Sequence, residues 1–173
     1  TQHLFTNKQL RTLLVPIMVE QLLSSLMGTA DTMMVSNVGS AAISAVSLVD
    51  AINILVIQAL SALAAGGAIL CSQYLGSQNL KKAKRSAEQV LFVMLVLSCS
   101  LSLLCLIFRF PLLRLIFGTV DTDVMANSQI YFFFTLLSFP FIGLYDAGAS
   151  ILRAQNNTKG PMTISILSNF LNI

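Results

Sequence analysis

The stretch AINILVIQALSALAAGGAILCSQYLGSQNL, residues 51–80, contains no charged side chain. At the standard rise of about 1.5 Å per residue, a helix of this length extends about 45 Å. The hydrocarbon core of a bilayer is about 30 Å thick, so the segment can cross it with some tilt. Two further charge-free segments follow, at residues 89–108 and 124–145. Together they predict an all-α, polytopic transmembrane helix bundle.

The composition agrees with lipid as the main solvent of this chain. Hydrophobic residues make up 55% of the 173 residues, and charged residues only 10%. Soluble domains carry about 25% charged residues. Mean hydropathy is +0.81. The formal net charge is +3, and the ten basic residues are spread along the chain. Residues spread in this way do not form the basic patch that binds nucleic acid, so no nucleic-acid partner is expected.

Cysteine and histidine usage argues against an enzyme. Cys71, Cys99 and Cys105 lie in apolar runs without a CxxC or Cys/His pattern, and His3 is the single histidine. Neither a metal site nor a disulfide framework is predicted from this usage. The motifs HExxH and GxSxG are absent from the sequence. We expect a protein that is not an enzyme and that has no cofactor and no structural metal.

Five helices are predicted, at residues 10–35, 41–76, 84–108, 124–153 and 160–173. The last one reaches the end of the sequence without a stop signal, so we expect the chain to be a fragment of a longer protein. Residues 109–119, RFPLLRLIFGT, carry two arginines and a proline and predict an interfacial connector. Asp123 is the predicted N-cap of the helix that follows.

The basic residues predict the orientation of the spans. Eight of them lie around the start of the first predicted helix or around the connections that follow the second and the fourth: Lys8, Arg11, Lys81, Lys82, Lys84, Arg85, Arg153 and Lys159. Only Arg109 and Arg114 fall on the other side. The positive-inside rule therefore places the N-terminus in the cytoplasm. The basic loop at residues 81–85 serves topology in the simplest interpretation, and an anionic-lipid site is the alternative.

Small residues are concentrated in ALSALAAGGAIL, residues 59–70. Ala62 and Gly66 form a small-xxx-small pair, and Gly67 lies beside it. Such positions let helices approach closely in lipid. Helix packing is the simpler interpretation of this cluster, and a gating hinge is the alternative.

The carboxylates inside the predicted spans include Glu20, Asp31, Asp50 and Asp146. A charged Asp at the bilayer centre costs about 2.5–3.5 kcal/mol, so such residues face a water-filled cavity or the bundle interior. No Lys or Arg is near Glu20 or Asp31 in the sequence, and we expect both to lack a basic partner. They are eleven positions apart, which places them on one helix face about 16 Å apart. That face could line a cation path, or each acid could bond a neighbouring helix.

The remaining candidate positions in the spans are Asp50, Asp146 and Pro16. Asp50 is expected near the outer end, either hydrated or lining a polar cavity, and Asp146 near the cytoplasmic end in a structural role. Pro16 lies one turn before Glu20 and predicts a helix bend, which could be mobile or static.

Two asparagines mark the last predicted helix. Asn169 and Asn172 are three positions apart and share a face. Amide groups in lipid need partners, so packing between helices is one interpretation. Amide oxygens also suit a hard cation when a carboxylate is nearby, which makes the pair a candidate ion site.

Several motifs resemble the multidrug and toxic compound extrusion (MATE) family, more narrowly its bacterial branch of DinF-type transporters. They include GTADTMMVSNVG at 28–39, AAISAVSLVDAIN at 41–53, GGAILCSQYLGSQNLKKAKRSAEQ at 66–89 and GASILRAQNNTKGPMTISILSNFLNI at 148–173. The motifs follow one another in the order and spacing of the family, and the resemblance covers nearly the whole chain.

The resemblance implies helices one to five of the N-terminal lobe in a twelve-helix fold of two six-helix lobes. Asp31 matches the first-helix acid implicated in coupling, and Asn172 matches a helix-five Asn near the same cavity. The family often has an Asp four residues after that Asn. Asn156 stands where the family usually has Gly, which should alter the turn. Glu20 is less uniform in the family.

The resemblance implies a secondary active transporter of the bacterial plasma membrane, monomeric when full length, that exports cationic or amphiphilic drugs in antiport with H⁺ or Na⁺. Asp31, Asn169 and Asn172 are the predicted ion-coupling residues, and Glu20 and Asp50 are weaker cavity candidates. A lipid-linked precursor flippase of related fold is an alternative. It requires basic residues in the cavity, where we expect none. A non-transporting membrane assembly subunit is a further alternative.

Overall fold

The computed structural model describes residues 7–37 and 39–172, apart from the side chains of residues 31, 171 and 172. In this part the chain is all helical. The helices are α1 (Asn7–Ser36), α2 (Ser40–Gly76), α3 (Leu80–Ile107), α4 (Arg109–Phe117), α5 (Thr122–Ala154) and α6 (Lys159–Asn172). Four of them, α1, α2, α3 and α5, are long and apolar enough to cross a membrane. The expected polytopic helical fold is therefore confirmed.

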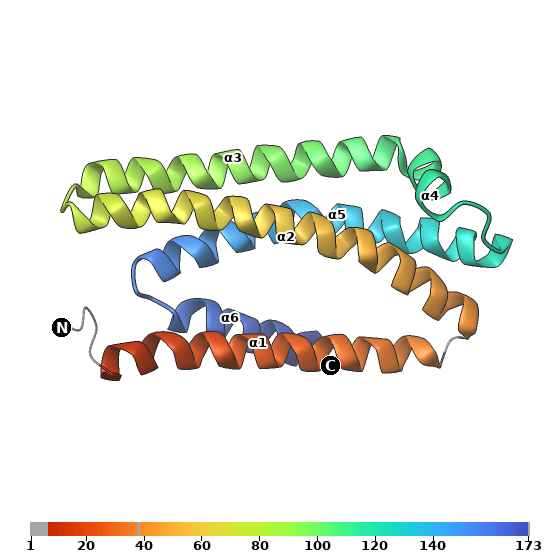
Figure 1. The fold of residues 1–173 in the computed structure, drawn as a ribbon, viewed down its shortest axis with the longest axis horizontal. Helices are drawn as coiled ribbons and strands as arrows, with labels where there is room; N and C mark the ends of the chain where they lie inside the picture. Colours follow the sequence, from red (N-terminus) through yellow and green to blue (C-terminus); the bar gives the residue numbers. More distant parts are fainter. Residues whose placement is uncertain (1–6, 38, 173) are drawn as a thin grey trace.

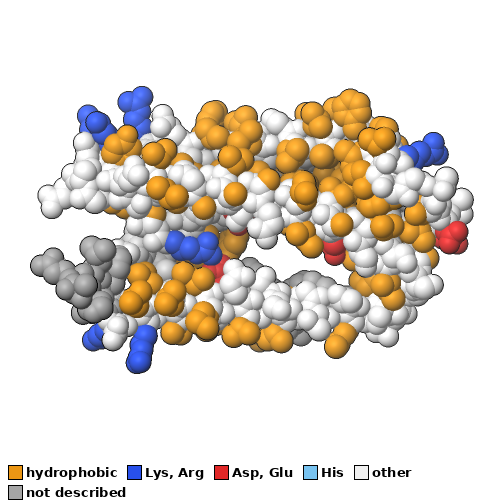
Figure 2. Space-filling view, in the orientation of Figure 1, with side chains coloured by type: hydrophobic (Ala, Val, Ile, Leu, Met, Phe, Trp, Pro, Cys, Tyr) orange, Lys and Arg blue, Asp and Glu red, His pale blue; other side chains and the backbone are white. Residues whose placement is uncertain are grey.

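The helices form two layers (Figure 1). One layer contains α2, α3 and α5, which pack extensively against one another. The other contains α1 and α6, which lie side by side. Among the described residues, α1 has many contacts with α6, few with α2 and hardly any with α5. The two layers therefore meet mainly near their ends, and the space-filling view shows this face hollowed between them (Figure 2).

The hydrophobic core lies within the three-helix layer. Its largest fully buried side chains include Phe132, Phe139, Met94 and Leu136. By contrast, the most apolar window of α1 is only 11% buried. Apolar faces of this size are not left open to water in soluble proteins, and in this chain they suit contact with lipid.

Glycines let the helices of the core approach closely. A Cβ at Gly67 would lie 2.5 Å from Cγ2 of Val90, and one at Gly143 would lie 2.8 Å from Cβ of Ser98. The first contact joins α2 to α3 and the second joins α5 to α3. The packing interpretation of the small residues therefore holds at Gly67, whereas Gly66 has nothing within 4 Å.

The connections differ in detail from the sequence expectations. The third span begins at Leu80 rather than 84, because the side chain of Asn79 accepts a hydrogen bond from the amide of Lys82 at 3.1 Å and caps the helix. The expected connector at 109–119 contains the short helix α4, which is too short to span a bilayer. The prediction of Asp123 as N-cap is wrong. The cap is Asp121, and Asp123 lies in the first turn of α5.

One end of the molecule carries most of the basic residues. The start of α1, the α2–α3 connection and the α5–α6 connection all lie at this end (Figure 1), and basic side chains gather there in the space-filling view (Figure 2). We call it the basic end.

Candidate functional site

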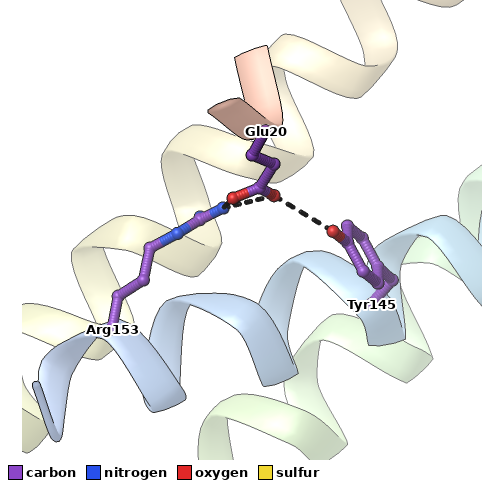
Figure 3. Close-up of polar contacts among 3 residues, drawn as sticks. All are labelled: Glu20, Tyr145 and Arg153. Atoms are coloured by element: carbon purple, nitrogen blue, oxygen red, sulfur yellow. Dashed lines mark hydrogen bonds and ion pairs between the residues drawn. The ribbon is translucent and has the colours of Figure 1, made fainter. Parts of the chain in front are cut away.

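An ion pair joins α1 to the last turn of α5 (Figure 3). Nη2 of Arg153 lies 2.8 Å from both carboxylate oxygens of Glu20, and the hydroxyl of Tyr145 donates to Oε1 of Glu20 at 3.1 Å. The Glu20 residue is only 8% exposed. The carboxylate of the first span thus meets a guanidinium and a phenol from the fifth helix of the chain.

This pair corrects the expectation that Glu20 lacks a basic partner and that the space between the helices holds no basic group. Arg153 is 133 positions away along the chain, so a search of the neighbouring sequence does not find it. In the sequence, Arg153 is the last residue of the predicted span 124–153, a position that predicts a place outside the bundle interior. A long side chain at a helix end can nevertheless extend back along the helix, since Cβ atoms point toward the helix N-terminus.

A second carboxylate lies beside the ion pair. Asp146 is seven positions before Arg153 on α5, which is nearly two full turns and therefore the same face. It hydrogen-bonds with Ser61 of α2 and interacts electrostatically with both Arg153 and Glu20. Its Oδ2 atom is buried and has no hydrogen-bond partner among the described residues, and the same is true of Nε of Arg153. Asp146 is therefore within electrostatic reach of Arg153, whose ion pair is with Glu20.

The first turns of α1 are held to the α5–α6 connection by a second polar contact. Proline has no amide hydrogen, so Pro16 leaves the carbonyl of Thr12, four residues earlier, without its helical partner. The hydroxyl of Thr158 donates to that carbonyl at 3.2 Å, and Thr158 is 4% exposed. Pro16 and Glu20 are the two buried residues among the described side chains of α1. The predicted bend is thus an anchored position; whether it moves stays a prediction.

The backbone conformation of the α5–α6 turn explains how Asn156 can stand where the family usually has glycine. This residue has a φ of +61°, in the left-handed region where glycine is favoured and asparagine is tolerated. The amide of Asn157 donates to the carbonyl of Leu152 at 2.9 Å, which closes the end of α5. The turn therefore keeps the left-handed conformation without glycine, and it places Arg153 in the last turn of α5.

Asp50 is attached to α5 rather than left free. Its Oδ1 accepts hydrogen bonds from the hydroxyl of Tyr131 at 2.9 Å and from the side-chain Nδ2 of Asn53 at 3.2 Å. Asn53 is 6% exposed. These contacts make Asp50 part of the α2–α5 interface, and a role in a cavity stays a prediction.

The predicted ion-coupling residues come from two helices that pack together. Asp31 belongs to α1, and Asn169 and Asn172 belong to α6. The side chains of Asp31 and Asn172 lie outside the described residues. Asn169 is half-buried, and its Nδ2 atom is buried without a hydrogen-bond partner in the described structure. The coupling role of this set stays a prediction.

Comparison with known families gives a match to the MatE family model over residues 16–173. Among curated proteins, the chain is similar to the uncharacterized transporter YisQ of Bacillus subtilis. The two are 31% identical over 159 residues, which is 91% of this chain and 34% of YisQ. No solved structure matches the chain.

Two other relatives have names that state a function. The probable multidrug resistance protein NorM of Thermotoga maritima is 26% identical over 169 residues, 96% of this chain and 35% of that protein. A FAD transporter of Shewanella oneidensis is 27% identical over 144 residues, 83% of this chain and 31% of that protein. The chain spans about a third of the length of the curated relatives it matches.

Proposed function

The chain belongs to the MatE family of membrane transporters, which are not enzymes, and we propose that it is part of an exporter of cationic or amphiphilic organic compounds. The driving force in this proposal is the inward movement of H⁺ or Na⁺. The helices α1, α2, α3, α5 and α6 would be the first five helices of the N-terminal lobe. The relative from Thermotoga maritima that is named a probable multidrug resistance protein supports the proposal of drug export. We also place the chain in the DinF-type branch, on the motifs quoted above.

The observation that carries the proposal is the charge of the groups between the helices. Among the described residues, hydrogen bonds and charge interactions between the long helices involve three carboxylates, Glu20, Asp50 and Asp146, but one guanidinium. That guanidinium, Arg153, is already bound by Glu20. An interior with excess acid favours organic cations, whereas a flippase for pyrophosphate-linked lipids needs free basic groups. The same reasoning disfavours an anionic substrate such as FAD.

Coupling is proposed to occur at Asp31, with Asn169 and Asn172 on the adjacent helix α6. In alternating access, one carboxylate binds either the coupling ion or the substrate, and each bound state shifts the conformational equilibrium through its differential affinity. Protonation or Na⁺ binding at Asp31 would weaken its hold on a cationic drug and favour release. The intact protein is proposed to be monomeric in the bacterial plasma membrane, with the basic end in the cytoplasm.

The experiment uses the intact protein in proteoliposomes, with an imposed pH or Na⁺ gradient and a fluorescent organic cation as the probe. We expect gradient-driven movement of the cation and none of FAD. The variant Asp31→Asn should abolish this movement while the protein stays inserted and monodisperse. Transport of FAD alone, or normal cation transport by Asp31→Asn, would contradict the proposal.

A further inference from the structure

We propose that Glu20, Asp146 and Arg153 form a two-position latch at the basic end, in which Arg153 pairs with Glu20 when this end is closed and with Asp146 when it opens. The latch would control access to the space between the α1–α6 layer and the α2–α3–α5 layer. This inference rests on the proposed function, because a transporter needs such a barrier to close on one side at a time.

The closed position is the one that the structure describes. Among the described residues, the backbones of α1 and α5 come close to each other at hardly any position, and the hydrogen bonds between the two helices are those of Glu20 with Arg153 and Tyr145. The pair uses both carboxylate oxygens, with Tyr145 as an additional donor. Charge-assisted bonds of this kind are roughly twice as strong as neutral ones. α1 therefore cannot leave α5 unless Arg153 releases Glu20.

An anchored position lies one turn before the latch. The hydroxyl of Thr158 holds the carbonyl that Pro16 leaves free on Thr12. A helix interrupted in this way bends more easily at the proline. The part of α1 before Pro16 can thus stay attached to the α5–α6 connection while the part carrying Glu20 moves.

Asp146 is the second position for Arg153. The two residues share a face of α5, and an arginine side chain on a helix extends toward the N-terminus of that helix, which is the direction of Asp146. Oδ2 of Asp146 and Nε of Arg153 are both buried and without partners. Pairing with Asp146 would satisfy both atoms. The guanidinium therefore keeps a carboxylate partner in either position, which is the arrangement expected of a bistable element.

The test measures access to a cysteine on the Glu20 face of α1, without any transport assay. The intact protein carries Ser24→Cys, one turn beyond Glu20 on α1, in a background without other cysteines. A membrane-impermeant maleimide is applied from the side of the basic end, in vesicles of each orientation. Glu20→Gln should increase the rate of modification from this side about tenfold, the order expected when one charge-assisted contact is lost. Asp146→Asn should decrease it below the unmutated rate.

The opposite signs of these two effects distinguish a latch from a merely structural cluster. Glu88→Gln is the matched control, because Glu88 is an exposed carboxylate whose partner Lys84 lies 3.9 Å away on the same helix, and it should leave the rate unchanged. Tyr145→Phe removes one hydrogen bond only, so its rate of modification should lie between the rate of the control and the rate of Glu20→Gln. Exchange of charges in Glu20→Arg with Arg153→Glu should restore slow modification.

Equal signs for Glu20→Gln and Asp146→Asn, or no change with either, would overturn the latch. If Glu20→Gln does not fold, Tyr145→Phe and Asp146→Asn still have opposite expected signs. Because no substrate is involved, failure of the latch is seen as unchanged access, whereas failure of the proposed function is seen as absent cation transport.

Discussion

Glu20 and Arg153, 133 positions apart in the chain, form an ion pair in which a single nitrogen, Nη2 of Arg153, lies 2.8 Å from both carboxylate oxygens. The pair connects the first membrane-spanning helix to the end of α5. Through this pair, an acid that is isolated within an apolar helix has a partner on a second helix.

Loss of one partner of this pair should destabilise the protein more than loss of both. Glu20→Gln removes the charge-assisted contact between α1 and Arg153, and a cost of about 1–3 kcal/mol is expected. The lower part of that range is favoured because the Arg153 side chain is 34% exposed. In the double variant Glu20→Gln with Arg153→Met, part of the loss should be recovered. Thermal unfolding of the intact protein in detergent, arranged as a double-mutant cycle, measures the coupling, and purely additive effects would count against it.

The contact between Thr158 and Thr12 should depend on Pro16. In the native sequence Thr158→Val removes the donor to the Thr12 carbonyl and should cost about 1 kcal/mol. In a Pro16→Ala background the amide of residue 16 can bond that carbonyl itself, so the same substitution should cost less. Denaturation of the four proteins of the cycle measures this difference. Equal costs in both backgrounds would show that the proline does not create the site.

Gly67 and Gly66 provide a matched pair for the packing of α2 against α3. Gly67→Ala would place a Cβ 2.5 Å from Val90, so a loss of about 1–3 kcal/mol is expected. Gly66→Ala meets nothing within 4 Å and should be neutral or slightly stabilising, since alanine is the better helix former. Val90→Ala should rescue Gly67→Ala in part. Similar unfolding temperatures for the two single variants would contradict this account.

The backbone at position 156 should prefer glycine. Asn156→Ala forces an ordinary side chain into a left-handed conformation and should cost about 1 kcal/mol, whereas Asn156→Gly should be neutral or slightly favourable. Unfolding midpoints of the two variants test this. The same ranking at an exposed helical position would not be expected, because there glycine is the worse residue.

The helical fold could be predicted from the sequence because lipid imposes long apolar segments, and those segments are visible as charge-free runs such as 51–80. The partner of Glu20 could not be predicted in this way. Pairing between helices depends on which faces meet, and Arg153 shows no sequence signal beyond its place at the end of a span. At the start of α5, the predicted N-cap, Asp123, lies two residues after the observed one, Asp121, and both are aspartates.

The roles of Asp31, Asn169 and Asn172 remain predictions that come from motif resemblance. What the structure adds is that their helices, α1 and α6, are in contact. The anchoring of Thr12 could have been inferred from the sequence in part, because a proline inside a helix always frees the carbonyl four residues before it. The identity of the group that binds this carbonyl required the fold.

The separation of Glu20 from Arg153 also has a consequence for biosynthesis. A ribosome adds about 5–20 residues per second, so Arg153 emerges roughly 7 to 27 seconds after Glu20. During that interval the first span has been made, but the guanidinium that neutralises its carboxylate has not. The early helix must therefore be held by the insertion machinery or lie close to the membrane surface until α5 is complete.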